Sequence, residues 1–164
     1  ERVRASSCIQ RAAMASAVED VLGDRVADML RQTMDVFERS DQKAVRAIED
    51  ADDAVDRLYE AIKLYLIQIS RNELGEEESR RYVEILTFTT NLEHIGDIID
   101  KNLMELAGKK IKNRYAFSPE GTAELKAFHA RVLENLRLAL NVFTTRDIAL
   151  ARRLVAEKTA MREA

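Results

Sequence analysis

The longest regular pattern in the sequence is a run of apolar side chains, spaced three and four residues apart, between residues 42 and 71. It passes through Ala44, Ile48, Ala51, Val55, Leu58, Ile62, Leu66 and Ile69. This spacing places all of them on one side of an α-helix. A helix of roughly 30 residues is about 45 Å long. That length is too great for a compact α/β unit and is typical of a helical bundle.

The rest of the chain contains few residues that would interrupt a helix. The 164 residues include only 5 glycines and 1 proline, and 34% of them are charged, which is a composition typical of long helices. The predicted fold is therefore all-α, an antiparallel helical bundle. We expect helices over about residues 12–39, 42–71 and 76–108, a fourth beginning at Ser118-Pro119, and a fifth from Asp147 to the end.

A short pattern recurs at a constant offset of 106 residues. Val36, Phe37, Asp41 and Ile48 match Val142, Phe143, Asp147 and Leu154. The fourth and fifth helices therefore look like a second copy of the first two, with no counterpart of the third. We expect one three-helix bundle in residues 1–115 and a partial second repeat of two helices in residues 116–164.

Two acidic triplets with the pattern E-x-x-x-D-x-x-D lie inside the second and third predicted helices. Positions i, i+4 and i+7 share one face of a helix, so each triplet forms a ridge of carboxylates that repel one another. Each ridge is offset from the core stripe of its own helix, so we expect neither to be buried in the bundle. Because the two helices are antiparallel neighbours, the ridges could face one shared surface. The residues are Glu49, Asp53 and Asp56 in the first ridge, and Glu93, Asp97 and Asp100 in the second.

Carboxylates without cysteine or a well-placed histidine favour hard or borderline cations such as Mg²⁺, Mn²⁺, Ca²⁺ or Fe³⁺. Two solvated acidic faces would give the same pattern, and the sequence leaves both interpretations open. His94 points away from its neighbour Glu93 around the helix and is expected on the surface. His129, beside Phe128, is expected to have a structural role. The basic residues between Lys109 and Arg114 either complement a helix C-terminus or contact a phosphate or an acidic lipid surface.

Several functional classes have no support in the sequence. There is no Ser-His-Asp or Cys-His arrangement, no phosphate-binding glycine loop and no Glu-x-x-His pair of the di-iron proteins, so we predict that the chain is not an enzyme. The net charge of −3 gives no electrostatic argument for nucleic acid as a partner. Cys8 is the single cysteine, which fits a reducing compartment. No apolar run approaches 18 residues, so the chain as given is expected to be soluble.

The acidic segments resemble a known family. Residues 49–58 and 92–97 are similar to the paired E-x-x-x-D motifs of PhoU proteins. The resemblance implies two tandem three-helix bundles, a role in regulating phosphate uptake and signalling, and metal clusters bound on the acidic motifs. This sequence departs from that pattern in its second copy, where Val155 and Thr159 stand at the positions of Glu49 and Asp53.

Residues 91–103 and 117–121 resemble in particular the PhoU-like domain fused to the C-terminus of bacterial sodium/phosphate cotransporters. By position, that resemblance implies a metal site at Glu49, Asp53, Glu93 and Asp97, supported by Asp56 and Asp100. The metal itself, whether Fe, Mn, Mg, Zn or Ca, is not implied.

The resemblance implies a regulatory domain on the cytoplasmic side of the inner membrane, in a sodium-dependent phosphate transporter. Its partner would be the membrane domain of the same parent chain, with a homodimer as a further expectation. The alternative is a standalone PhoU-type regulator of phosphate uptake and signalling. A metal-dependent enzyme is a third alternative, with no general base or nucleophile beyond the ligands.

Overall fold

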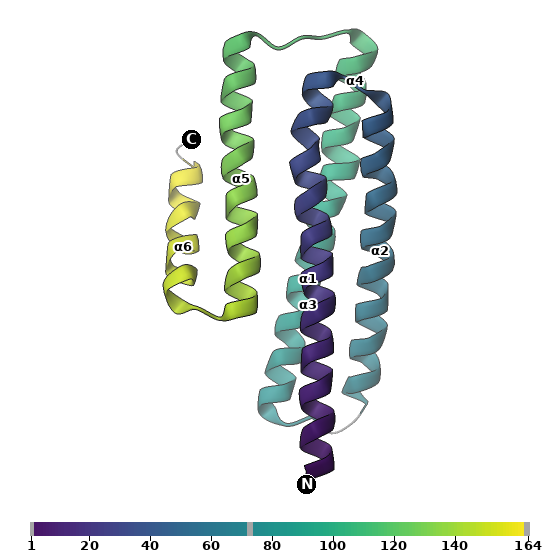
Figure 1. The fold of residues 1–164 in the computed structure, drawn as a ribbon, viewed down its shortest axis with the longest axis vertical. Helices are drawn as coiled ribbons and strands as arrows, with labels where there is room; N and C mark the ends of the chain where they lie inside the picture. The colour runs from purple at the N-terminus through teal and green to yellow at the C-terminus, as the bar shows by residue number, and fades with distance from the viewer. Residues whose placement is uncertain (1, 72–73, 163–164) are drawn as a thin grey trace.

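A computed structural model describes residues 2–71 and 74–162, with side chains from residue 21 onward. Every regular element in this part of the chain is helical, as predicted (Figure 1). In order, the elements are α1 (Arg2–Arg39), α2 (Gln42–Ser70), α3 (Glu76–Asp97), the π-helix η1 (Ile98–Met104), α4 (Glu105–Asn113), α5 (Pro119–Thr145) and α6 (Ile148–Arg162).

The first three helices form an antiparallel bundle around one apolar core. Contacts join α1 to α2, α2 to α3 and α1 to α3, and η1 and α4 continue α3 along the same bundle. The fully buried side chains come from all three long helices, as expected where amphipathic helices turn their apolar stripes toward one axis. They include Leu22, Val26, Met29, Ile48, Val55, Leu92, Ile99 and Met104.

The predicted helix starts are confirmed by their capping bonds. The Asp41 carboxylate accepts a hydrogen bond from the backbone N–H of Lys43 at 2.8 Å, at the start of α2. Ser118 caps α5 in the same way, with Pro119 in the first turn. Asp147 accepts from the backbone N–H of Ala149 at 2.7 Å, at the start of α6. Each bond satisfies a backbone donor that has no partner within its helix.

Two predicted helix boundaries are wrong. The first helix begins at Arg2 rather than near residue 12, and the third does not end near Gly108. Gly108 has an ordinary helical backbone, and α4 continues through it to Asn113. The residue that ends α4 is Arg114, whose φ of 55° is left-handed. Glycine is the residue most often found in this left-handed conformation at the end of a helix, but other residues can adopt it. The predicted break after the second helix lies partly at residues 72–73, outside the described residues.

The π-helix changes which residues of the third helix face the core. Up to Ile99 the buried positions follow an α-helical rhythm, but the next fully buried side chain is Met104, five residues later. A π-turn accommodates one extra residue, and such turns are frequent at functional sites. The prediction of one uninterrupted α-helix missed this change.

The α5–α6 hairpin packs on the outside of the bundle, against α1 (Figure 1). Gly23 permits the close approach, because a Cβ there would lie 2.4 Å from Cδ2 of Leu140. Among the described residues, α6 packs against α5 and no other helix. The apolar spacing of α5 predicts Leu125 and Phe128 on its core face, but they are 40% and 47% exposed. No third helix covers that side of the hairpin in the described part of the chain.

None of the described helices is both long and apolar enough to cross a membrane.

Candidate metal centre

Asp52 occupies a core position of α2. It lies between Ile48 and Val55, both fully buried, and its own exposure is only 5%. The side-chain oxygen Oδ1 of Asp52 is buried without a hydrogen-bond partner. A buried, unpartnered carboxylate oxygen is costly and rare in folded proteins. Such a group calls for a specific explanation.

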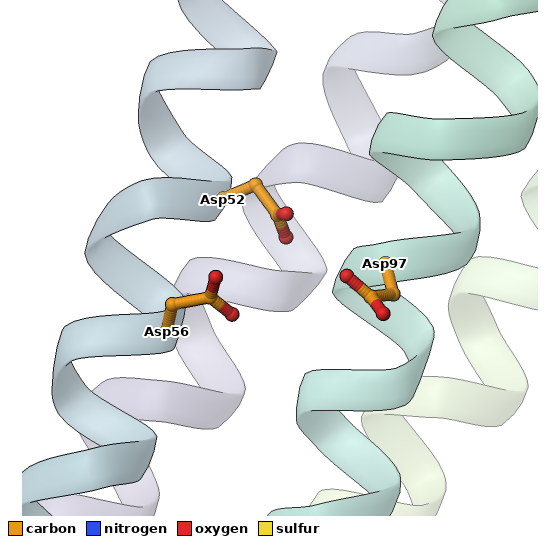
Figure 2. A group of neighbouring side chains, drawn as sticks. All are labelled: Asp52, Asp56 and Asp97. Carbon is orange, nitrogen blue, oxygen red and sulfur yellow. The ribbon is translucent and has the colours of Figure 1, made fainter.

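Two more carboxylates lie beside Asp52. Asp56 follows one turn later on α2, and Asp97 is the last residue of α3. One carboxylate oxygen from each of Asp52, Asp56 and Asp97 lies within 4.8 Å of the other two. Figure 2 shows the three carboxylates pointing toward one another across the gap between the two helices. We refer to Asp52, Asp56 and Asp97 as the three-carboxylate group.

Gly96 makes room for this arrangement. A Cβ at residue 96 would lie 2.7 Å from Oδ1 of Asp52 and 3.4 Å from Cγ1 of Val55. The first distance is shorter than any ordinary contact of a Cβ atom. Only glycine therefore allows α3 to approach the Asp52 carboxylate this closely.

The electrostatics of the group are unfavourable for a charged Asp52. Burial, together with the charges of Asp100, Asp56 and Asp97, raises the pKa of the Asp52 carboxyl from 3.8 to about 6. The ammonium of Lys101, which donates a hydrogen bond to Asp97, acts in the opposite direction. The pKa of Asp100 is also raised, mainly by burial. Close carboxylates repel one another when ionised, and a bound cation would remove that repulsion.

The structure places five of the six predicted residues at two neighbouring locations and the sixth, Glu93, at neither. Asp56 and Asp97 belong to the three-carboxylate group. Glu49, Asp53 and Asp100 line an adjacent open hollow of about 600 Å³, between α2 and the η1–α4 segment. Glu93 is half-buried one turn before Asp97 and lies outside the three-carboxylate group. Whether any of the six binds a metal stays a prediction.

The second ridge is less exposed than its sequence indicated. Glu93, Asp97 and Asp100 are half-buried rather than solvent-facing, because α2 packs close beside them. The prediction used only the angular positions of residues around their own helix, so it did not account for burial by a neighbouring helix.

Sequence reasoning missed Asp52, although a signal for it exists. The predicted core stripe of the second helix used Ala44, Ala51 and Leu58, which are half-buried in the structure. The residues that face the core more directly are one position later, at Val45 and Asp52. Val45, Asp52, Tyr59 and Leu66 are seven residues apart, the heptad spacing of a bundle core. An aspartate within that apolar series is the signal that could have drawn attention to Asp52.

The three-carboxylate group fits a metal cation by its chemistry. Three oxygen donors converge from two helices, one of them buried and unpartnered, and such donors suit Mg²⁺, Mn²⁺, Ca²⁺ or Fe³⁺. Asp52, Asp56 and Asp97 would hold the ion. A cation there would neutralise the group and join α2 to α3.

The two histidines lie where the sequence predicts. His94 is exposed, and His129 is half-buried, with its Nε2 2.6 Å from the backbone oxygen of Leu30 on α1. That contact joins α5 to the bundle and is a structural role. In the predicted basic cluster, Lys110 donates to the hydroxyl of Ser40 at 2.8 Å. It thereby ties the end of α4 to the α1–α2 turn.

The family model of the PhoU domain matches residues 20–105, which contain the three-carboxylate group. This chain belongs to the PhoU domain family. The resemblance inferred from the acidic segments is thereby confirmed, and so is the all-α bundle expected of that family.

Curated relatives match almost the whole chain. A protein of Salmonella typhimurium named "Putative inorganic phosphate export protein YjbB" is 40% identical over 153 residues, 92% of this chain. Proteins of the same name from Escherichia coli strain K12 and Shigella flexneri are 37% identical over the same length. The chain spans 28% of the length of these relatives. No solved structure matches it at a significant level.

Proposed function

We propose that this PhoU domain regulates a phosphate transport protein of which it forms one part, and that a metal cation bound by Asp52, Asp56 and Asp97 is the signal. The transport role is supported by the relatives, which are named as inorganic phosphate export proteins and are much longer than this chain. The partner would be the membrane domain of the same parent chain, on the cytoplasmic side. The domain itself has no catalytic role in this proposal.

The cation site rests above all on one observation, the buried Asp52 carboxylate with an unpartnered oxygen at a core position. An apolar residue there would make the bundle more stable, so a functional reason for the charge is expected. A cation held between α2 and α3 would draw the two helices together. It would thereby change the surface that the bundle offers to the rest of the transport protein.

Calorimetric titration of the metal-free domain with Mn²⁺, Mg²⁺ and Fe³⁺ tests the site. We expect one of these cations to bind, and binding to be lost in an Asp52→Asn/Asp97→Asn double variant. Asp35→Asn, which changes an exposed carboxylate on α1, is the control and should bind as the parent does. No binding by the parent, or equal loss in the control, would overturn the site.

Phosphate flux tests the regulatory role in the full-length parent protein. Cells producing the parent with Asp52→Asn/Asp97→Asn should move radiolabelled phosphate at an altered rate and no longer respond to the cation. Flux identical to that of the unaltered parent under every cation condition would overturn the regulatory proposal. Repeating the assay with choline in place of sodium tests the sodium dependence that the resemblance implies.

A further inference from the structure

The three-carboxylate group already has a positive charge next to it. The ammonium of Lys101, in the π-helix η1, donates a hydrogen bond to Oδ1 of Asp97 and forms an ion pair with it. The oxygens of the group lie within 4.8 Å of one another, so a cation bound to all three would compete with this ammonium for Asp97. Two positive charges close together on one carboxylate repel each other.

The influence of Lys101 extends beyond Asp97. Its pKa is raised, first by the hydrogen bond to Asp97 and further by the charges of Asp97, Asp52 and Asp56. In return, the ammonium lowers the pKa of Asp52. All three carboxylates of the group therefore interact with the same lysine.

The Lys101 side chain has open space beside it. Its side chain is 63% exposed, whereas that of Asp97 is only 26% exposed. Lys101 also lines the adjacent hollow, together with Glu49, Asp53 and Glu105. These carboxylates offer the ammonium a second position after it leaves Asp97. The π-turn contributes, because it places Asp100 and Lys101 along the same hollow as residues of α2.

We infer that Lys101 is a built-in counterion that neutralises the three-carboxylate group in the metal-free protein and is displaced when a metal cation binds. This inference rests on the proposed cation site and adds how that site is regulated. The lysine weakens metal binding, so that a cation must be abundant or strongly bound to replace it. Displacement also moves a positive charge from the site into the hollow, where it changes the surface of the domain.

The matched control is Lys109. It too pairs with a carboxylate four residues earlier, Glu105, and its side chain is 60% exposed. Lys101→Gln and Lys109→Gln therefore remove the same charge from the same type of ion pair. Only the first pair includes a residue of the three-carboxylate group.

The first experiment measures Mn²⁺ affinity by calorimetry near neutral pH. We expect Lys101→Gln to bind Mn²⁺ about threefold or more tightly than the parent, since the displaced ion pair no longer opposes binding. Lys109→Gln should change little, and Lys101→Arg, which keeps the charge, should stay close to the parent. Equal or weaker binding by Lys101→Gln, with binding by the parent intact, would overturn the inference and leave the proposed site standing.

The second experiment needs no bound metal. In the presence of a chelator, Lys101→Gln should lower the unfolding temperature more than Lys109→Gln does, because three carboxylates lose their counter-charge. In an Asp52→Asn/Asp97→Asn background that excess should disappear. Lys101 does not neutralise the group if Lys101→Gln lowers the unfolding temperature of the parent no more than Lys109→Gln does. The same conclusion follows if the larger drop persists in the Asp52→Asn/Asp97→Asn background. If none of the proteins binds a cation, displacement fails together with the proposed site, and this comparison still decides the counterion role.

Discussion

Asp52 lies in the position that a three-helix bundle normally gives to an apolar side chain. Its neighbours along the core stripe of α2, Ile48 and Val55, are fully buried, and it shares their burial. In the metal-free protein the carboxyl is either protonated or charged beside other carboxylates, and both states are less favourable than an apolar side chain. Such a residue lowers stability and is typical of sites where function opposes stability.

A pH dependence follows from the raised pKa of Asp52. Since this pKa is about 6 in the folded protein and 3.8 ordinarily, the folded state binds a proton more tightly than the unfolded state. The free energy of unfolding should therefore fall as the pH rises from about 4 to about 6, by up to about 3 kcal/mol from this group. Asp52→Asn should remove this decrease and stabilise the metal-free protein at neutral pH. Urea unfolding at several pH values, with a chelator present, measures the effect.

Asp35→Asn serves as the control for this prediction, because it removes an exposed carboxylate of α1. It should retain the pH dependence of the parent. If Asp52→Asn unfolds with the same pH dependence as the parent, Asp52 does not titrate between these limits in the folded protein.

At the scale of the helices, the site depends on how closely α2 and α3 approach. The contact between them includes polar side chains as well as apolar ones, since the hydroxyls of Tyr59 and Thr90 share a hydrogen bond of 3.3 Å. Gly96 brings the backbone of α3 against Asp52, and the π-helix begins two residues later. A side chain at residue 96 would push the two helices or the carboxylate apart.

Two glycines of the same continuous helical segment should respond in opposite ways to alanine. Gly96→Ala should destabilise the protein by about 1–3 kcal/mol through overpacking, and should weaken Mn²⁺ binding because Asp52 is displaced. At Gly108 a Cβ would meet nothing within 4 Å, so Gly108→Ala should stabilise the protein by about 0.5–1 kcal/mol. Denaturant unfolding and calorimetry measure both effects. A neutral Gly96→Ala with unchanged Mn²⁺ affinity would show that the close contact is not required.

At the scale of the whole molecule, the repeat in the sequence has a counterpart in the backbone. Ser40 and Arg146, 106 residues apart, both adopt left-handed conformations, with φ of 52° and 56°. The backbone N–H of Ser40 donates to the carbonyl of Val36, and that of Arg146 to the carbonyl of Val142. Each is followed by the aspartate that caps the next helix. The α1–α2 and α5–α6 turns are therefore built alike.

The two halves differ in what their second helix packs against. Six residues of α2 are buried because α2 lies between α1 and α3, whereas no residue of α6 is buried. A carboxylate group that needs two neighbouring helices can form beside α2, but in the part of the chain that the structure describes α6 has only α5 as a neighbour. The division into units of residues 1–115 and 116–164 stays a prediction.

Truncation after Arg146 tests whether the three-carboxylate group depends on the first bundle and not on α6. The shortened chain should remain helical and unfold cooperatively, because α6 has no buried residue and, among the described residues, makes no contact with the first bundle. Its Mn²⁺ affinity should stay within about twofold of the parent, a free-energy change well below that of one lost ligand. Circular dichroism and calorimetry measure these two properties. Loss of cooperative unfolding, or of Mn²⁺ binding, would show that the second repeat supports the site.

The amino-acid sequence by itself determined the all-α fold, the starts of α2, α5 and α6 and the α1–α2 repeat. These features depend on local signals: apolar residues three and four apart, capping side chains such as Asp41 and Asp147, and the scarcity of glycine and proline. The sequence also indicated an acidic surface on α2 and α3, including Asp56 and Asp97. Each of these signals lies within one helix or one turn, so it can be seen without knowing the neighbours.

Only the tertiary structure decided which carboxylates meet. The exact rotation of α2 turned Asp52 into the core, the π-turn after Asp97 placed Asp100 and Lys101 beside α2, and Gly96 set the distance between the helices. A rotation of one residue, about 100°, separates an exposed side chain from a buried one on the same helix. The choice between them depends on packing against other helices, and so the sequence pattern of a single helix left Asp52 out of the predicted site.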